Sequence, residues 1–106
     1  GLTIVMEQLN QVEFKKLHMV IGVVDDKNLS NIFELLPQSA TYYFTRSQIP
    51  RALNERALRD KAYASGLHGE SYEHVADALH AARASAGEND LIYIGGSTFV
   101  VAEALT

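Results

Sequence analysis

The chain has 106 residues, a formal net charge of −4 and 47% hydrophobic residues, which suits one globular domain with a single core. The absence of cysteine excludes disulfides, thiolate nucleophiles and cysteine zinc sites, and it fits a reducing compartment. We find no basic stripe, no apolar stretch of membrane-spanning length and no signal peptide, so we expect a cytoplasmic domain that binds neither nucleic acid nor membrane.

The first half of the chain alternates predicted helices and strands. Residues 5–12 have the apolar spacing of an opening helix. Residues 18–24 form a nearly continuous aliphatic run, which predicts a strand buried on both faces of a parallel sheet. A polar loop follows, then a helix that stops before Pro37, and then a second strand over residues 41–45.

The second half continues the alternation. Asn54 is placed to cap a helix that ends at Gly66, because asparagine favours helix starts and glycine favours helix ends. Residues 67–72 predict a short edge strand, and an alanine-rich helix then ends at Gly87. The apolar run over residues 91–94 predicts a final strand, which leads through a glycine pair into a last helix.

Repeated strand–helix units predict an α/β fold in which helices cover both faces of a mostly parallel sheet, giving three layers. In such sheets, ligands bind beyond the carboxyl ends of the strands. Polar loops follow three of the predicted strands, so we expect them to meet at one edge. These loops contain Asp25, Asp26 and Lys27, residues 46–53, and residues 95–97.

Two of these loops carry charged side chains with alternative interpretations. Asp25 and Asp26 could orient a cation or accept hydrogen bonds, and Lys27 could pair with an anion, but a solvated loop that caps the next helix is the simpler interpretation. Arg51 follows Pro50, whose fixed φ stiffens the loop. A guanidinium held in this way suits a carboxylate, although a surface ion pair is the alternative.

The third loop contains Gly95, Gly96 and Ser97 between a strand and a helix. The unpaired backbone N–H groups of a helix start suit a carboxylate or a phosphate, whereas a simple capping role for Ser97 is the alternative. The histidines predict no metal site, because His74 and His80 lie on different faces of their helix and the others are isolated. We expect the histidines to be solvated rather than to bind a ligand.

Four successive segments resemble motifs of one known family. They are residues 17–27, 42–45, 49–52 and 95–103. Together they resemble the C-terminal domain of bacterial folylpolyglutamate synthase/dihydrofolate synthase, a Rossmann-like domain of the Mur ligase superfamily. The resemblance extends over essentially the whole chain, in order and with plausible spacing.

The resemblance implies an ATP-dependent ligase that adds glutamate to folate or dihydropteroate through an acyl phosphate, with magnesium on the nucleotide phosphates. Gly96 and Ser97 match the family's glycine-serine turn near the glutamate site, and Arg51 matches its proline-arginine-alanine motif. Asp25, Asp26 and Lys27 become candidates on the nucleotide side.

The resemblance also implies that important parts lie outside this chain. The phosphate loop, the metal ligands and the family's first strand of this domain are all missing from it, so we expect residues 1–106 to be a fragment of a larger two-domain enzyme. The fragment should hold no catalytic residue and no cofactor, and should be inactive alone. We expect the missing strand beside residues 18–24, where its loss leaves a gap or an exposed edge through which the fragment could dimerise.

Two other functions remain open on the sequence. The first is the matching domain of a cell-wall Mur ligase, although such enzymes typically carry a lysine-glycine-histidine-glutamate turn where this chain has residues 96–99. The second is a free-standing flavodoxin-like binding or signalling module, which the presence of Asp25 and Asp26 superficially suggests.

Overall fold

Four parallel strands form the middle layer of the domain. The computed structural model describes residues 16–24, 29–50, 52–95 and 98–104. The order across the sheet is β3-β2-β1-β4, and every neighbouring pair is parallel. The strands are β1 (Leu17–Ile21), β2 (Thr41–Phe44), β3 (Gly69–Ser71) and β4 (Leu91–Gly95).

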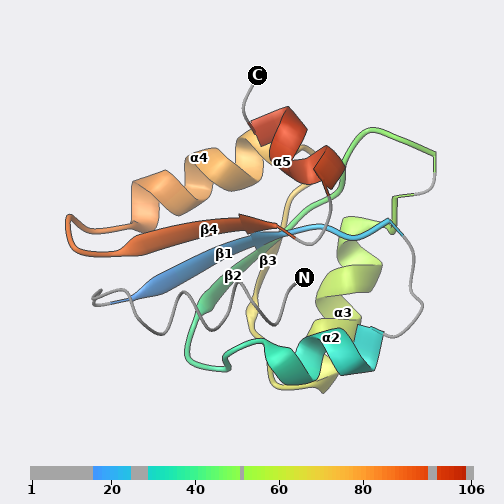
Figure 1. The fold of residues 1–106 in the computed structure, drawn as a ribbon, viewed down its shortest axis with the longest axis horizontal. Helices are drawn as coiled ribbons and strands as arrows, with labels where there is room; N and C mark the ends of the chain where they lie inside the picture. Colours follow the sequence, from blue (N-terminus) through green and yellow to red (C-terminus); the bar gives the residue numbers. More distant parts are fainter. Residues whose placement is uncertain (1–15, 25–28, 51, 96–97, 105–106) are drawn as a thin grey trace.

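Helices cover both faces of this sheet, as Figure 1 shows. Because successive strand residues point to opposite faces, Met19 of β1 lies in the core beside α2 and α3, whereas its neighbour Val20 lies in the core beside α4. The three-layer α/β prediction is therefore confirmed. None of the described helices combines the length and apolar character needed to cross a membrane. The helices are α2 (Leu29–Leu35), α3 (Glu55–Ala64), α4 (Val75–Ser85) and α5 (Thr98–Ala104).

The ends of α3 follow from two residues of the sequence. The Asn54 side-chain oxygen accepts hydrogen bonds from the backbone N–H groups of Arg56 (2.9 Å) and Ala57 (3.2 Å), so the predicted cap is confirmed. Gly66 has φ +86° just past the end of the helix, a conformation that favours glycine. These two signals fix where the loop before α3 ends and where the chain turns toward β3.

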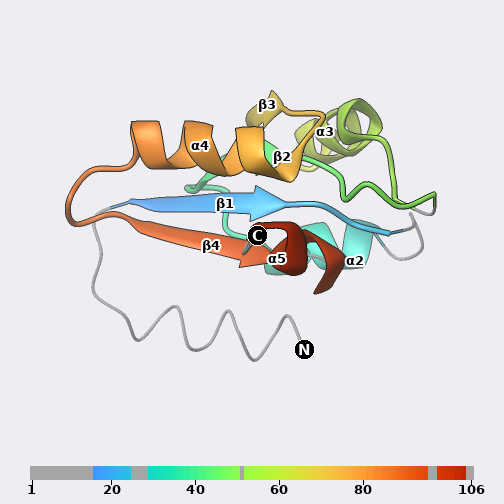
Figure 2. The ribbon, with the colours of Figure 1, turned by 90° about the horizontal axis from the view of Figure 1, so that it is seen from above.

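Two expectations about the sheet are wrong. The first strand ends at Ile21, not at residue 24. The gap or exposed edge expected beside it is also absent, because β1 pairs with β2 on one side and with β4 on the other. The described edge on that second side is β4 (Figure 2). Its apolar residues from Leu91 to Ile94 are half-buried. The predicted opening helix lies outside the described residues, and dimerisation through an edge stays a prediction.

Candidate functional site

The carboxyl ends of the strands are linked by backbone hydrogen bonds. The Leu53 N–H donates to the Val23 carbonyl (2.9 Å), which joins the end of the loop after β2 to the segment after β1. The Gly22 N–H donates to the Gly95 carbonyl (3.3 Å), which joins that segment to the end of β4. Residues that flank the three predicted loops therefore meet at one edge of the sheet, as expected for parallel strands.

The candidate side chains themselves are not placed by the structure. They fall in the gaps between the described ranges, so their roles stay predictions, and what the structure adds is the geometry of the residues on either side. These candidates are Asp25, Asp26, Lys27, Arg51, Gly96 and Ser97.

Close packing at Gly22 positions α5 over this edge. A Cβ atom at Gly22 would lie 2.8 Å from the Thr45 carbonyl oxygen and 2.8 Å from Cγ2 of Val100. Val100 is buried and belongs to the first turn of α5, which begins at Thr98. Because there is no room for a side chain, glycine at position 22 allows α5 to approach the end of β1.

An ionic cluster anchors the start of the loop after β2. The Nε atom of Arg46 lies 3.3 Å from Oε1 of Glu55, and a terminal nitrogen of the same guanidinium lies 3.6 Å from Oε1 of Glu73. The Glu55 side chain is buried and the Glu73 side chain is exposed. Neither Nε of Arg46 nor Oε1 of Glu55 makes a hydrogen bond, and neither does the buried hydroxyl of Thr45, so the contact is ionic rather than a directed pair.

The charge of this cluster limits what it can bind. One guanidinium faces two carboxylates, which leaves the cluster of Arg46, Glu55 and Glu73 net negative. An anionic substrate at this edge would therefore need cationic or N–H groups outside the cluster. The part of the chain that the structure describes also contains no group of three or more histidine, aspartate or glutamate residues that could hold a metal ion.

The middle of the same loop is tied to two further segments. The Gln48 backbone N–H donates to Oε2 of Glu103 in α5 (2.8 Å), and the Gln48 amide group donates to the Glu73 backbone carbonyl (2.9 Å). A hydrogen bond from the Ala52 N–H to the Ile49 carbonyl (3.1 Å) then closes the segment that carries Pro50. The loop is therefore held at several points by elements distant in sequence.

A second polar network, near the amino ends of β1 and β4, was missed by the sequence analysis. The His18 ring donates from Nε2 to Oδ2 of Asp90 (2.9 Å), and its Nδ1 lies 2.9 Å from the Tyr43 hydroxyl. Because the carboxylate can only accept, a neutral ring accepts at Nδ1 from that hydroxyl. His18 is 3% exposed, so the expectation that it is solvated is wrong. The position of His18 within a nearly continuous apolar run was the feature of the sequence that could have predicted its burial.

The environment of Asp90 stabilises its charged form. The backbone N–H of Gly87 donates to its carboxylate at 2.9 Å, and the His18 ring donates to the same oxygen. These two hydrogen bonds, in that order of importance, hold the pKa of Asp90 below its ordinary value. The side chains of His18 and Asp90 are only 4% and 8% exposed, which indicates a structural role.

A parallel α/β sheet with polar loops gathered at its carboxyl edge defines a class of domains that bind ligands at that edge. The sequence matches the family described as "Mur ligase, glutamate ligase domain" over residues 1–98, so the chain belongs to this family.

Known relatives point to folate enzymes within the family. A "probable bifunctional folylpolyglutamate synthase/dihydropteroate synthase" of Haloferax volcanii is 33% identical over 101 residues, which are 92% of this chain and 12% of the relative. Escherichia coli FolC, solved in complex with DHPP and ADP, is 27% identical with a TM-score of 0.81, over 98% of this chain and 24% of that one.

A third comparison concerns the fold. The bifunctional folylpolyglutamate synthase/dihydrofolate synthase of Yersinia pestis, solved with AMPPNP and Mn, is 21% identical with a TM-score of 0.85. The match covers 98% of this chain and 25% of that protein. The chain thus spans about an eighth to a quarter of the lengths of these relatives.

Proposed function

We propose that this chain is the C-terminal, substrate-closing domain of an ATP-dependent ligase that adds glutamate to folate or dihydropteroate. The observation that carries this proposal is the meeting of three loop-flanking segments at one edge, in a chain of the glutamate ligase domain family. The similarity to folate enzymes supports the folate-type acceptor over a cell-wall acceptor. The rest of the enzyme, including an N-terminal ATP-binding domain, would come from the much larger remainder of such a protein.

The reaction has two steps. A carboxylate oxygen of the acceptor attacks the terminal phosphorus of ATP, which releases ADP and leaves an acyl phosphate. The amine of glutamate then attacks the acyl carbon, phosphate departs, and an amide remains after the amine loses a proton. This domain would contribute to the second step by holding glutamate and closing over the nucleotide, since proximity and orientation lower the barrier of such an attack.

We assign the glutamate-binding role to Ser97, Gly96 and Arg51. The hydroxyl of Ser97 and the backbone N–H groups beside it would donate to a glutamate carboxylate, and the Arg51 guanidinium would bind it in two-pronged fashion. The helix that follows, α5, has only 7 residues, so we expect directed hydrogen bonds rather than a large helix dipole to provide the binding energy. Asp25, Asp26 and Lys27 would face the nucleotide.

Magnesium would be held mainly outside this domain. The described residues do not offer a cluster of metal ligands, and the ionic cluster of Arg46, Glu55 and Glu73 has its carboxylates occupied by a guanidinium. When bound, the metal would neutralise charge on the ATP phosphates. Because the family's phosphate loop and metal ligands are expected outside this chain, the isolated chain should catalyse no amide synthesis.

The test is a glutamate titration of the full-length enzyme and of its Ser97→Ala variant, with ATP, magnesium and a pteroate or folate acceptor. Loss of a hydrogen bond to a charged group corresponds to roughly a tenfold rise or more in the KM for glutamate. Ser85→Ala, at an exposed serine that ends α4, provides the matched control and should leave the KM unchanged.

The possible outcomes separate the competing functions. An active parent with a raised KM in Ser97→Ala supports both the ligase and the site. An active parent with an unchanged KM keeps the ligase and reduces Ser97 to a helix cap. Amide formation with cell-wall acceptors alone, or with none, contradicts the folate assignment. Amide synthesis by the isolated chain contradicts the expectation that catalysis requires the N-terminal ATP-binding domain.

A further inference from the structure

The loop after β2 and helix α5 are joined by a contact that crosses 55 positions of sequence. The Gln48 backbone N–H donates to Oε2 of Glu103 at 2.8 Å. Gln48 belongs to the loop that carries Arg51 three positions later, and Glu103 belongs to the helix that begins just after Ser97. The contact therefore connects the loop that carries Arg51 to the helix that follows the turn of Ser97.

This contact is a hydrogen bond of defined geometry from a loop backbone to a helix side chain. Its donor is a backbone N–H, which has no side-chain freedom to lose, and its acceptor is a charged carboxylate. Glu103 is itself half-buried, and the helix that carries it is fixed on the sheet by Val100 packed against Gly22. The carboxylate is thus presented from a fixed element to a loop.

The other anchors of the loop lie on either side of Gln48. At the start, Arg46 is paired with Glu55 and Glu73, and at the end the Leu53 N–H donates to the Val23 carbonyl. Between these points, Gln48 links the loop to α5 and to the segment before α4. Its backbone contact to Glu103 fixes the loop against α5, while its side chain reaches the backbone of Glu73.

We propose that Glu103 is a positioning residue of the ligase: its carboxylate fixes the backbone at Gln48 and so holds the loop after β2 against α5. This inference rests on the proposed function, because its readout is glutamate binding. Glu103 would act through Gln48 rather than on glutamate directly. Its loss should weaken glutamate binding in the ground state and the transition state alike, so the KM rises while kcat changes little.

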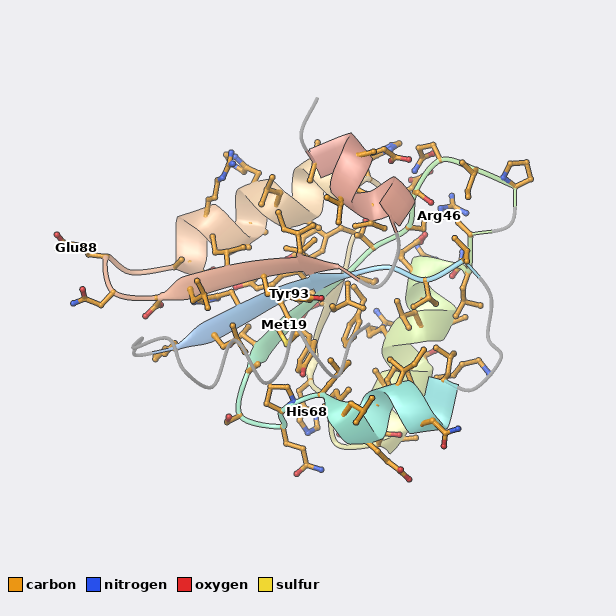
Figure 3. The ribbon with its side chains drawn as sticks, viewed as in Figure 1. Met19, Arg46, His68, Glu88 and Tyr93 are labelled. Atoms are coloured by element: carbon orange, nitrogen blue, oxygen red, sulfur yellow. The ribbon has the colours of Figure 1, made fainter. Side chains whose placement is uncertain are left out.

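The experiment compares three variants of the full-length protein. Glu103→Ala removes the acceptor and should raise the KM for glutamate about tenfold, with kcat within about twofold of wild type. Glu103→Gln keeps a side-chain oxygen that can accept from the Gln48 N–H, so it should recover most of the lost affinity. Glu88→Ala removes the same charge from an exposed turn at the opposite end of the molecule, as Figure 3 shows for Glu88 and Arg46, and should behave as wild type.

A second readout does not depend on activity. Hydrogen exchange at the backbone N–H of Gln48 should be faster in Glu103→Ala, because its hydrogen-bond acceptor is removed. The exchange should stay slow in Glu88→Ala. Faster exchange together with a raised KM and rescue by glutamine supports the inference. An active wild type whose glutamate KM is unchanged in Glu103→Ala overturns it and leaves the proposed function intact. A wild type that forms no amide from glutamate overturns the proposed function first, and with it this role of Glu103.

Discussion

The two ends of the sheet carry polar networks of opposite design. Near the amino ends of β1 and β4, His18 and Asp90 form a largely buried chain of hydrogen bonds with the Tyr43 hydroxyl. At the carboxyl ends, Arg46, Gln48 and their carboxylate partners form a half-exposed set of contacts between loops and helices. The buried network is closed and stabilises the fold, whereas the exposed one arranges segments around a binding edge at little gain in stability.

The largest expected effect comes from breaking the buried network. His18→Ala should lower the free energy of unfolding by about 3 kcal/mol, because it opens a cavity and leaves the Tyr43 hydroxyl without its ring partner. Urea denaturation of the 106-residue chain measures the loss. His80→Ala, an exposed histidine of α4, should change stability by less than about 0.5 kcal/mol. Equal effects at the two histidines would contradict a structural role for His18.

The contribution of the buried network to stability should also depend on pH. Since the pKa of Asp90 is lowered in the folded state from its ordinary 3.8, its contacts stabilise the fold above that pH and lose this contribution as the pH falls through the folded pKa. The stability difference between wild type and Asp90→Asn should therefore be full near neutrality and shrink below about pH 4. A difference that is constant across this range would show that the charge of Asp90 plays no part.

A smaller loss is expected where α5 meets the carboxyl edge. Gly22→Ala forces a methyl group against the Thr45 carbonyl and Val100, and should cost about 1–2 kcal/mol because the backbone there has little room to move. Gly87→Ala is the matched control, since its added Cβ would meet only Asp90 at ordinary contact distances of 3.7 Å and more. Thermal unfolding compares the two. A neutral Gly22→Ala would mean that α5 shifts freely over the edge.

The sequence predicted those features that depend on nearby residues. Asn54 and Gly66 act within one or two turns of α3, and the alternation of strands and helices follows from local apolar patterns. The meeting of loops at one edge was also predictable, because it follows from parallel strands in general.

Contacts between distant residues were beyond such reasoning. Tyr43 and Asp90 lie 25 and 72 positions from His18, so the burial of that histidine depends on the strand order rather than on its neighbours. The place of β4 beside β1, where a gap was expected, has the same origin. Within the candidate site, the pairing of Gln48 with Glu103 likewise requires the helix and the loop to be placed first.

The smallest expected effect lies in the exposed part of the carboxyl edge. Glu73→Gln removes one charge 3.6 Å from Arg46 but leaves the Glu73 backbone carbonyl that accepts from Gln48, so it should alter stability by less than about 0.5 kcal/mol. Glu55→Gln, in the buried position of the same cluster, should cost more, because the Glu55 side chain is 7% exposed and solvent screens its contact with Arg46 less. Chemical denaturation at low and high salt measures both. If Glu73→Gln lowered the stability as much as Glu55→Gln and the loss did not depend on salt, the contacts at the carboxyl edge would form a closed, stabilising network like that of His18. The proposed difference between the two polar networks would then be wrong.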